Sequence, residues 1–184
     1  MPAPGEEVVQ NVISADAKGM FVLPNLPSGD YVLCGGVPTL PYLDPCKWAA
    51  SPRVTVAPNA ASKATLVLTK GVFLKVRIND PTHLLPQVKD GPLRASNLIV
   101  GVKFANGAYL GATNTGVDTS GRDYEMIVPT GVPLKLWLFS HHVSLADTSG
   151  QAVDMSGALI SFQATSGSDQ VFAFTVSGPT AQSR

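Results

Sequence analysis

The residues with the clearest chemical potential are two adjacent histidines, His141 and His142, which lie close in sequence to Ser140, Ser144 and Asp147. Imidazole and carboxylate groups can hold a metal ion, and a serine beside a histidine and an aspartate can act as a nucleophile. Adjacent residues of a strand point to opposite faces, so the two rings cannot share one metal ion unless the chain bends sharply. No nucleophile elbow surrounds either serine. We therefore predict a polar strand end here, with no catalytic, cofactor or metal role.

A second group of oxygen-bearing side chains, Asp118, Ser120 and Asp123, has the chemistry of a calcium site. An Asp-x-x-Gly turn of the same spacing begins at Asp16, but it lacks the matching acidic residues. Aspartate at the start of such a turn hydrogen-bonds the backbone, and the glycine supplies a positive φ. The pattern therefore favours a plain turn over a metal site.

Cys34 and Cys46 are the only cysteines, and the Gly- and Pro-rich span between them is expected to form a long loop without regular structure. A disulfide across this span would stabilise the fold by about 3 kcal/mol and would indicate an oxidising compartment. Two reduced thiols, with Cys34 buried at a strand end, are the alternative. A zinc site would need further ligands, and the nearest histidine is His83. We predict the disulfide.

Aromatic residues gather around this loop, among them Tyr31, Tyr42 and Trp48. Exposed rings on a β module can stack on sugars or anchor a partner, whereas buried rings close the end of a sandwich. Both alternatives stay open from the sequence. Tyr42 and Trp48 are thus candidate binding residues in the loop from Gly35 to Trp48, and the segment from His83 to Asn97 is a second candidate loop.

The composition excludes several functional classes. Of 184 residues, 13 are Lys or Arg and 13 are Asp or Glu, and no basic cluster of the kind that binds nucleic acid is present. No apolar run approaches the ~20 residues that span a bilayer. The first residues carry no basic segment followed by an apolar stretch, so no export signal is visible, which fits either an internal fragment or a processed end.

The elements that position these residues are expected to be short strands. Gly (17) and Pro (15) interrupt the chain throughout, and 45% of residues are apolar, which together favour an all-β fold with real cores. The clearest strand is Val72 to Asn79, where apolar residues occupy every second position until Asp80-Pro81. The other expected strands are Val8–Ser14, Met20–Leu23, Asp30–Cys34, Arg53–Val56, Ala64–Leu68, Leu98–Phe104, Ala108–Thr113, Asp123–Val128, Pro133–Ser140, Leu159–Ala164 and Val171–Val176. Asn106-Gly107 is a strong hairpin signal, and Ser144 to Met155 is a weak helix candidate.

An internal repeat suggests two related modules. Asp16-Ala-Lys-Gly19 recurs as Asp118-Thr-Ser-Gly121, and Pro27-Ser-Gly29 recurs as Pro129-Thr-Gly131 at the same offset. Each copy reads as a turn, a short strand and a second turn. We therefore predict an incomplete module over residues 1–70, a second β-sandwich module over residues 71–178 and a tail over residues 179–184.

Asp16-Ala-Lys-Gly-Met-Phe21 followed by Leu26-Pro-Ser-Gly-Asp-Tyr31-Val-Leu resembles the signature of carboxypeptidase regulatory-like domains. These domains are relatives of transthyretin and of the collagen-adhesin B-type repeats. The resemblance implies bacterial, Greek-key β-sandwich modules in tandem, usually accessory to a larger secreted or envelope protein. Members normally have two strands before this signature, whereas only Val8 to Ser14 precedes it here. The first module is therefore expected to lack its opening strands and to expose a sheet edge.

Lysine and glutamate in collagen-adhesin modules can support an isopeptide bond, for which Lys75 and Glu125 are the candidates. Strand alternation places Lys75 opposite the apolar face, which argues against it. The sequence thus predicts no enzyme and no cofactor. It predicts a structural or binding module of a secreted or envelope protein, acting through loops or through strand-edge pairing with a protein partner or a second copy. A carbohydrate-binding module is the alternative, and a transthyretin-like hydrolase, implied by the resemblance alone, is the second alternative.

Overall fold

A computed structural model describes residues 10–48, 52–85, 98–104, 107, 109–155 and 158–180. Within these ranges the chain is nearly all β, with one short helix, α1 (Pro45–Trp48). The chain divides into two compact units, the first formed by Met1–Leu33 with Ser51–Leu66 and the second by Cys34–Ala50 with Val67–Arg184. None of the described helical residues forms a segment long and apolar enough to cross a membrane.

The first unit has one pair of strands in its described residues, β1 (Gly29–Val32) and β3 (Arg53–Val56). They run antiparallel with Tyr31 opposite Val54, and both of these side chains lie half-buried on one side of the pair. The Tyr31 hydroxyl donates to the carbonyl of Pro27 at 2.8 Å, as in the tyrosine corner of β-sandwiches. No described residue of this unit is buried. The described part of the first unit is therefore one strand pair in which no side chain is fully buried.

Three strands expected in the first half of the chain are not found among the described residues. The described residues of Val8–Ser14, and all of Met20–Leu23 and Ala64–Leu68, lie outside any strand. The last two segments still alternate half-buried and exposed residues, as strand residues do. A strand also needs a neighbour to bind its N–H and C=O groups. Both segments therefore have the burial pattern of strands, but no partner strand pairs with them among the described residues.

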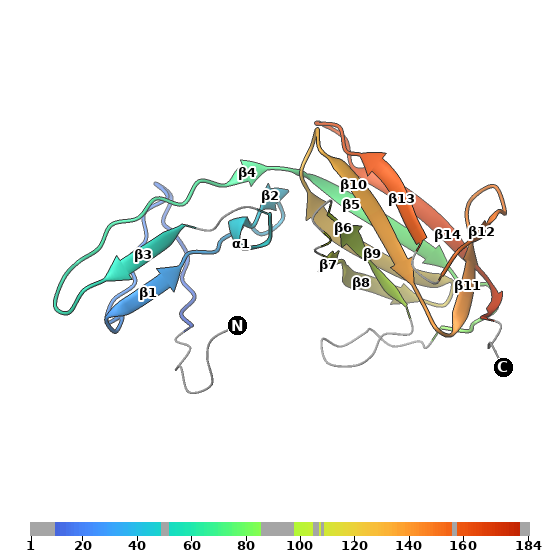
Figure 1. The fold of residues 1–184 in the computed structure, drawn as a ribbon, viewed down its shortest axis with the longest axis horizontal. Helices are drawn as coiled ribbons and strands as arrows, with labels where there is room; N and C mark the ends of the chain where they lie inside the picture. Colours follow the sequence, from blue (N-terminus) through green and yellow to red (C-terminus); the bar gives the residue numbers. More distant parts are fainter. Residues whose placement is uncertain are drawn as a thin grey trace. The chain divides into compact units, whose positions relative to one another are not determined.

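The second unit is a two-layered β structure (Figure 1). One sheet has six strands in the order β12-β11-β14-β5-β9-β8, and the other has four in the order β13-β10-β6-β7. Their bounds are β5 (Val72–Asn79), β6 (Ile99–Lys103), β7 (Tyr109–Gly111), β8 (Thr113–Asp118), β9 (Gly121–Val128), β10 (Pro133–Phe139), β11 (Val143–Ala146), β12 (Ala152–Val153), β13 (Ala158–Gln163) and β14 (Gln170–Pro179). The pair β5–β14 is parallel and the other pairs are antiparallel.

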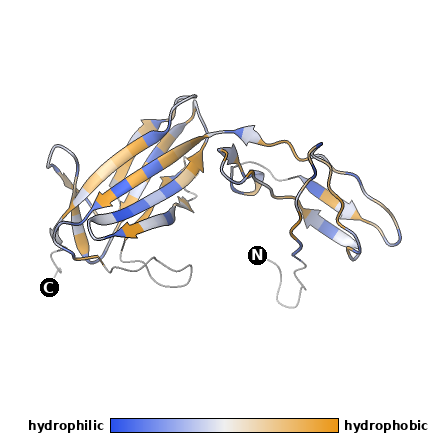
Figure 2. Cartoon of the chain, turned by 180° about the vertical axis from the view of Figure 1, so that it is seen from behind, coloured by the Kyte–Doolittle hydropathy of each residue, from blue (hydrophilic) through white to orange (hydrophobic). Residues whose placement is uncertain are grey.

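A single apolar core lies between these two sheets. Alternate residues of β5 and β10 point into it, so that Ile78, Leu136 and Leu138 have no exposed surface. The same alternation appears as apolar and polar bands along the strands in Figure 2. This arrangement confirms the predicted all-β, sandwich-like class, because only facing layers can hide every second residue of so many strands.

The span between the cysteines does contain regular structure, contrary to the expectation of an irregular loop. Strand β2 (Tyr42–Leu43) pairs with β4 (Thr69–Lys70), and α1 follows after Asp44, whose Oδ1 accepts the N–H of Cys46 at 3.0 Å. Aspartate before a proline-initiated helix is a favourable N-cap. Leu43 and Pro45 are buried, and the whole segment groups with the second unit. The predicted boundary near residue 70 thus places in the first module a segment whose contacts are with the second unit.

Other details of the second unit also differ from expectation. The weak helix candidate Ser144–Met155 is wrong, because this stretch forms β11, a turn and β12. Strand β8 was not predicted, and β14 runs through Pro179, so the first residue of the expected tail belongs to a strand. The predicted hairpin at Asn106-Gly107 is present as the antiparallel pair β6–β7, and Gly107 has a φ of 84°. Asn106 itself lies outside the described residues.

The two turns of the predicted repeat have different geometry. The N–H of Asp16 donates to the carbonyl of Met20 at 2.8 Å, and Gly19 has a φ of 77°. In contrast, Asp118 pairs directly with Gly121 across the two-residue hairpin loop between β8 and β9. The repeated letters therefore do not encode a repeated turn.

The turn that matches Asp16 begins at Asp147. Its N–H donates to the carbonyl of Gln151 at 2.9 Å, and Gly150 has a φ of 82°. Its Oδ1 accepts the N–H groups of Ser149 and Gln151, as Oδ1 of Asp16 accepts those of Lys18 and Met20. One turn type thus occurs once in each unit, at a spacing that the sequence repeat did not indicate.

Candidate functional site

The two histidines lie at the end of β10, and both are exposed. The ring of His141 packs edge-on against Phe139, with 4.6 Å between the ring centroids. The N–H groups of His142 and Val143 both donate to Oγ of Ser140 at 3.1 Å. Ser140 is buried and organises the turn into β11 through these bonds. These hydrogen bonds thus shape the turn between β10 and β11. No pair of a nucleophile and a base is among the described contacts.

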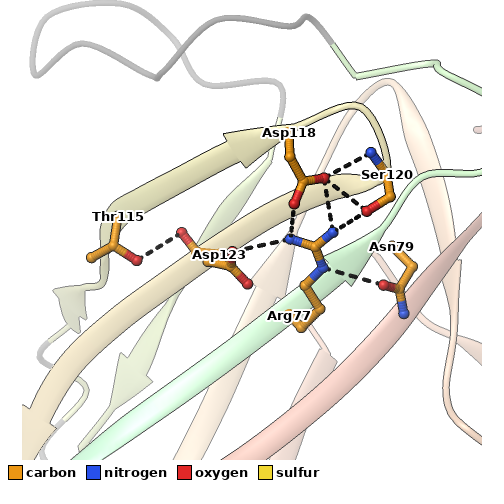
Figure 3. Close-up of polar contacts among 6 residues, drawn as sticks. All are labelled: Arg77, Asn79, Thr115, Asp118, Ser120 and Asp123. Carbon is orange, nitrogen blue, oxygen red and sulfur yellow. Dashed lines mark hydrogen bonds and ion pairs between the residues drawn. The ribbon is translucent and has the colours of Figure 1, made fainter.

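Asp118, Ser120 and Asp123 surround the guanidinium of Arg77 rather than an open space (Figure 3). Arg77 donates to both carboxylate oxygens of Asp118 at 3.0 Å and to Asp123 at 3.0 Å. This bidentate pairing and the hydroxyl and N–H of Ser120 hold the pKa of Asp118 well below its ordinary value, and the pKa of Arg77 is raised, chiefly by Asp118. These oxygens therefore bind the guanidinium of an arginine in the same sheet, and not a metal ion.

Lys75 projects from the outer face of the six-stranded sheet, as strand alternation predicted. Its ammonium is 2.6 Å from the carboxylate of Asp169, and both side chains are substantially exposed. Glu125 lies directly opposite on β9. An isopeptide bond requires a buried, uncharged lysine, so this exposed ion pair offers no such chemistry.

Cys34 and Cys46 form the predicted disulfide. Among the described residues, one group of three potential metal-ligand residues lies close together. It consists of these two sulfurs and a carboxylate oxygen of Asp44. Cysteine binds a metal ion as the thiolate, and sulfurs joined in a disulfide are not thiolates. This cluster is therefore a structural closure of the β2–α1 segment.

The two candidate binding residues of this segment are both half-buried. Trp48 packs edge-on against Phe104 at 4.8 Å between centroids and contacts the core of the second unit. Tyr42 lies in β2 opposite Lys70. The contacts of Trp48 favour the packing interpretation over an exposed aromatic platform. The second candidate loop, His83 to Asn97, lies mostly outside the described residues.

A different aromatic group occupies the outer face of the four-stranded sheet. Tyr109, Trp137, Phe139 and His141 form a chain of ring contacts, with centroid distances of 4.4, 6.1 and 4.6 Å in that order. We call these four residues the outer aromatic cluster. The sequence carried a signal for part of it, because Lys135, Trp137 and Phe139 alternate with three leucines that point into the core. Tyr109 and His141 come from other segments, so their convergence could not be read from one strand.

Tyr109 is held over the sheet by two glycines. A side chain at Gly101 would collide with the Tyr109 ring, and one at Gly111 would touch it. The Tyr109 hydroxyl donates to the carbonyl of Val100 at 3.1 Å, and burial raises its pKa to about 12. The ring is nevertheless 38% exposed, so one surface remains accessible.

A hollow of about 530 Å³ opens next to the outer aromatic cluster. Its outward-facing lining includes Lys103, Lys135, Leu159, Ser161 and Gln163. Lys103, which lines the hollow, places its ammonium 5.8 Å from the centroid of the Trp137 ring, so this side chain links the hollow to the cluster. The remaining lining residues, Phe104, Gly107, Pro133, Leu134 and Phe162, are mostly apolar, so the hollow offers apolar surface beside ammonium groups and polar side chains.

Comparison with known proteins adds no family to these observations. The chain matches no protein-family description, no curated protein and no solved structure.

Proposed function

We propose that this chain is a non-enzymatic structural or binding module of a secreted or envelope protein. It acts by pairing a free sheet edge of its first unit with a strand from a partner chain, either a second copy or another protein. The disulfide supports an oxidising compartment. The resemblance to carboxypeptidase regulatory-like modules, carried by Asp16 to Leu33, supports an accessory role in a larger assembly.

The observation that carries the proposal is the lack of buried side chains among the described residues of the first unit. Its described residues form one two-stranded sheet, and none of them is buried. Apolar side chains that a sandwich would cover are open to water, with exposed fractions of 82% for Val12, 67% for Met20 and 78% for Val22. A two-stranded sheet is marginal in water by itself. Added strands would cover these side chains and pair the free edges.

The backbone identifies which groups of β1 point away from β3. The N–H of Leu33 donates to the carbonyl of Pro52 at 3.0 Å, toward the β3 side. Because successive N–H groups of a strand point in opposite directions, the N–H of Val32 points to the outer edge of β1. Replacing Val32 by proline removes that donor and leaves the β1–β3 ladder intact, since proline is tolerated at strand edges.

Sedimentation velocity over a range of concentrations tests the proposal. We expect the wild-type chain to self-associate, or to sediment with a partner chain, and the Val32→Pro variant to be monomeric. Val32→Thr is the matched control, because it removes a similar amount of apolar surface and keeps the N–H. A wild-type monomer whose amides from Met20 to Val32 exchange slowly would show that the first unit is complete by itself, and the proposal would be wrong.

A further inference from the structure

Two lysines on the outer face of the four-stranded sheet face each other without compensation. Lys103 of β6 and Lys135 of β10 are direct cross-strand partners, and neither has a carboxylate partner in the described part of the chain. Like charges directly opposite each other on a sheet are destabilising. The other sheet of this unit shows the compensated alternative, where Lys75 lies opposite Glu125 and pairs with Asp169. The repulsion between the two lysines therefore lowers the stability of the sheet locally, and a bound anion would remove this repulsion.

Aromatic and polar side chains surround this pair on the same face. Trp137 lies two residues beyond Lys135 on β10, and its ring meets the Tyr109 ring at 87°. Ser161 lies directly opposite Lys135 on β13, and both line the hollow. A sugar ring has an apolar C–H face that packs on an aromatic ring and a rim of hydroxyls that needs polar partners. The surface supplies both kinds of contact.

From this arrangement we infer that the outer face of the four-stranded sheet binds an acidic polysaccharide. The rings of Trp137 and Tyr109 contact a sugar residue, and the ammonium groups of Lys103 and Lys135 bind its carboxylate or sulfate. This site lies wholly in the second unit and is independent of strand pairing by the first unit.

The backbone of this face disfavours an acidic peptide as the occupant. Strand β6 is paired with both β10 and β7, and β10 is paired with both β6 and β13. A peptide strand placed over the two lysines would therefore find no free N–H or C=O groups to pair with. A polysaccharide binds through rings and hydroxyls and has no such requirement.

Titration calorimetry with three acidic polysaccharides, polygalacturonate, alginate and hyaluronate, tests the inference. Two further probes separate its parts: methyl-esterified polygalacturonate keeps the sugar chain without the charge, and polyglutamate keeps the charge without the sugar. We expect binding to at least one of the three polysaccharides, and binding at least roughly tenfold weaker to both control polymers. Binding to none of the three, or equal binding to either control polymer, would overturn the inference.

Three variants locate the site. Trp137→Ala is expected to weaken binding by roughly tenfold or more, as for a central aromatic contact. Lys135→Glu is expected to abolish binding while leaving thermal stability equal or higher, because it places opposite charges across β6 and β10. Lys63→Glu, on an exposed residue of the first unit, changes net charge equally and is expected to bind as wild type. If Lys135→Glu binds as Lys63→Glu does, the lysine pair is not the site. Sedimentation of the same variants reports strand pairing separately.

Discussion

The first and second units follow the same rule of alternating apolar residues and reach opposite outcomes. In the second unit, every second residue of β5 and β10 is removed from water, and Ile78 and Leu136 have no exposed surface. In the first unit the same period-two pattern leaves Phe21 and Val54 only half-buried. The difference is the second layer. Alternation gives a sheet an apolar face, but burial requires another sheet to cover it.

Burial of apolar side chains contributes much more to the stability of the second unit than to that of the first. Complete burial of a leucine or isoleucine contributes roughly 1.5–3 kcal/mol, whereas ordering each residue costs about 1–2 kcal/mol. The second unit offsets this cost with twenty buried apolar residues in one cluster among its described positions. The first unit has none in its described residues. Added strands that cover the first unit would supply the missing burial, which is the physical basis of the proposed strand pairing.

The largest expected effect comes from truncating matched residues in the two units. Leu136→Ala removes a side chain from the closed core, and such changes cost about 2–5 kcal/mol. Val54→Ala removes a half-buried side chain and is expected to cost less than about 1 kcal/mol in the monomer. Urea denaturation of both variants measures the difference. A cost for Val54→Ala as large as that for Leu136→Ala in the monomer would show that the first unit has a packed core.

The disulfide is expected to matter for the second unit rather than the first. Replacing Cys34 and Cys46 by serine frees a segment that buries Leu43 and Pro45, and loss of a ring of this size costs about 3 kcal/mol. The loss is expected in the unfolding transition of the second unit, followed by tryptophan fluorescence, because Trp48 and Trp137 both belong to it.

Non-reducing mass spectrometry of the intact chain provides the control for this comparison. Two thiols that react with an alkylating reagent without prior reduction would contradict both the bond and the oxidising compartment inferred from it.

Strands could be predicted from the sequence where the residues of the strand and its immediate neighbours determine its bounds. The bounds of β3 and β5 were predicted to the residue, because their apolar alternation is complete and Gly, Pro or Asp ends it. Strand β8 was missed, because Thr113 to Asp118 is mostly polar and forms an edge strand. Met20–Leu23 was predicted wrongly for the opposite reason, since it is an apolar run that has no neighbouring strand among the described residues. Pairing depends on topology, and topology is not contained in a window of a few residues.

The candidate site shows the same limit. Tyr42 and Trp48 lie within four residues of Cys46 in the sequence, but the half-buried Trp48 packs against Phe104, which lies far along the chain. The cross-strand pair of Lys103 and Lys135 requires the register of β6 against β10. Single residues with chemical potential were visible in the sequence, whereas the contacts that give them a role were not.

A smaller effect is expected from the turn that the two units share. Gly19 and Gly150 both have positive φ, at 77° and 82°, and no atom lies within 4 Å of a Cβ built on either. Alanine there carries only the backbone penalty, about 1–2 kcal/mol. Gly150→Ala is expected to lower the global stability of the second unit by this amount. Gly19→Ala is expected to leave global unfolding unchanged and to speed amide exchange only around Asp16. A global loss in both variants would show that the two units unfold together.

The smallest expected effect is a dependence of the stability of the second unit on acid. The pKa of Asp118 is lowered chiefly by Arg77, and that of Asp147 is lowered chiefly by the hydroxyl of Ser149. Below an unfolded pKa of about 3.9, the unfolded chain binds protons that the folded chain does not, so stability is fully present above this value and falls as pH drops. Both side chains are exposed, so each contribution is small.

Asp118→Asn is expected to flatten the acid limb of the stability curve. A salt concentration of 1 M is expected to mimic that variant, because screening weakens an exposed ion pair more than a neutral hydrogen bond. Asp147→Asn also flattens the acid limb, but the part it removes is expected to be insensitive to salt. If salt affects both aspartates equally, the Arg77 pair contributes nothing beyond the turn itself.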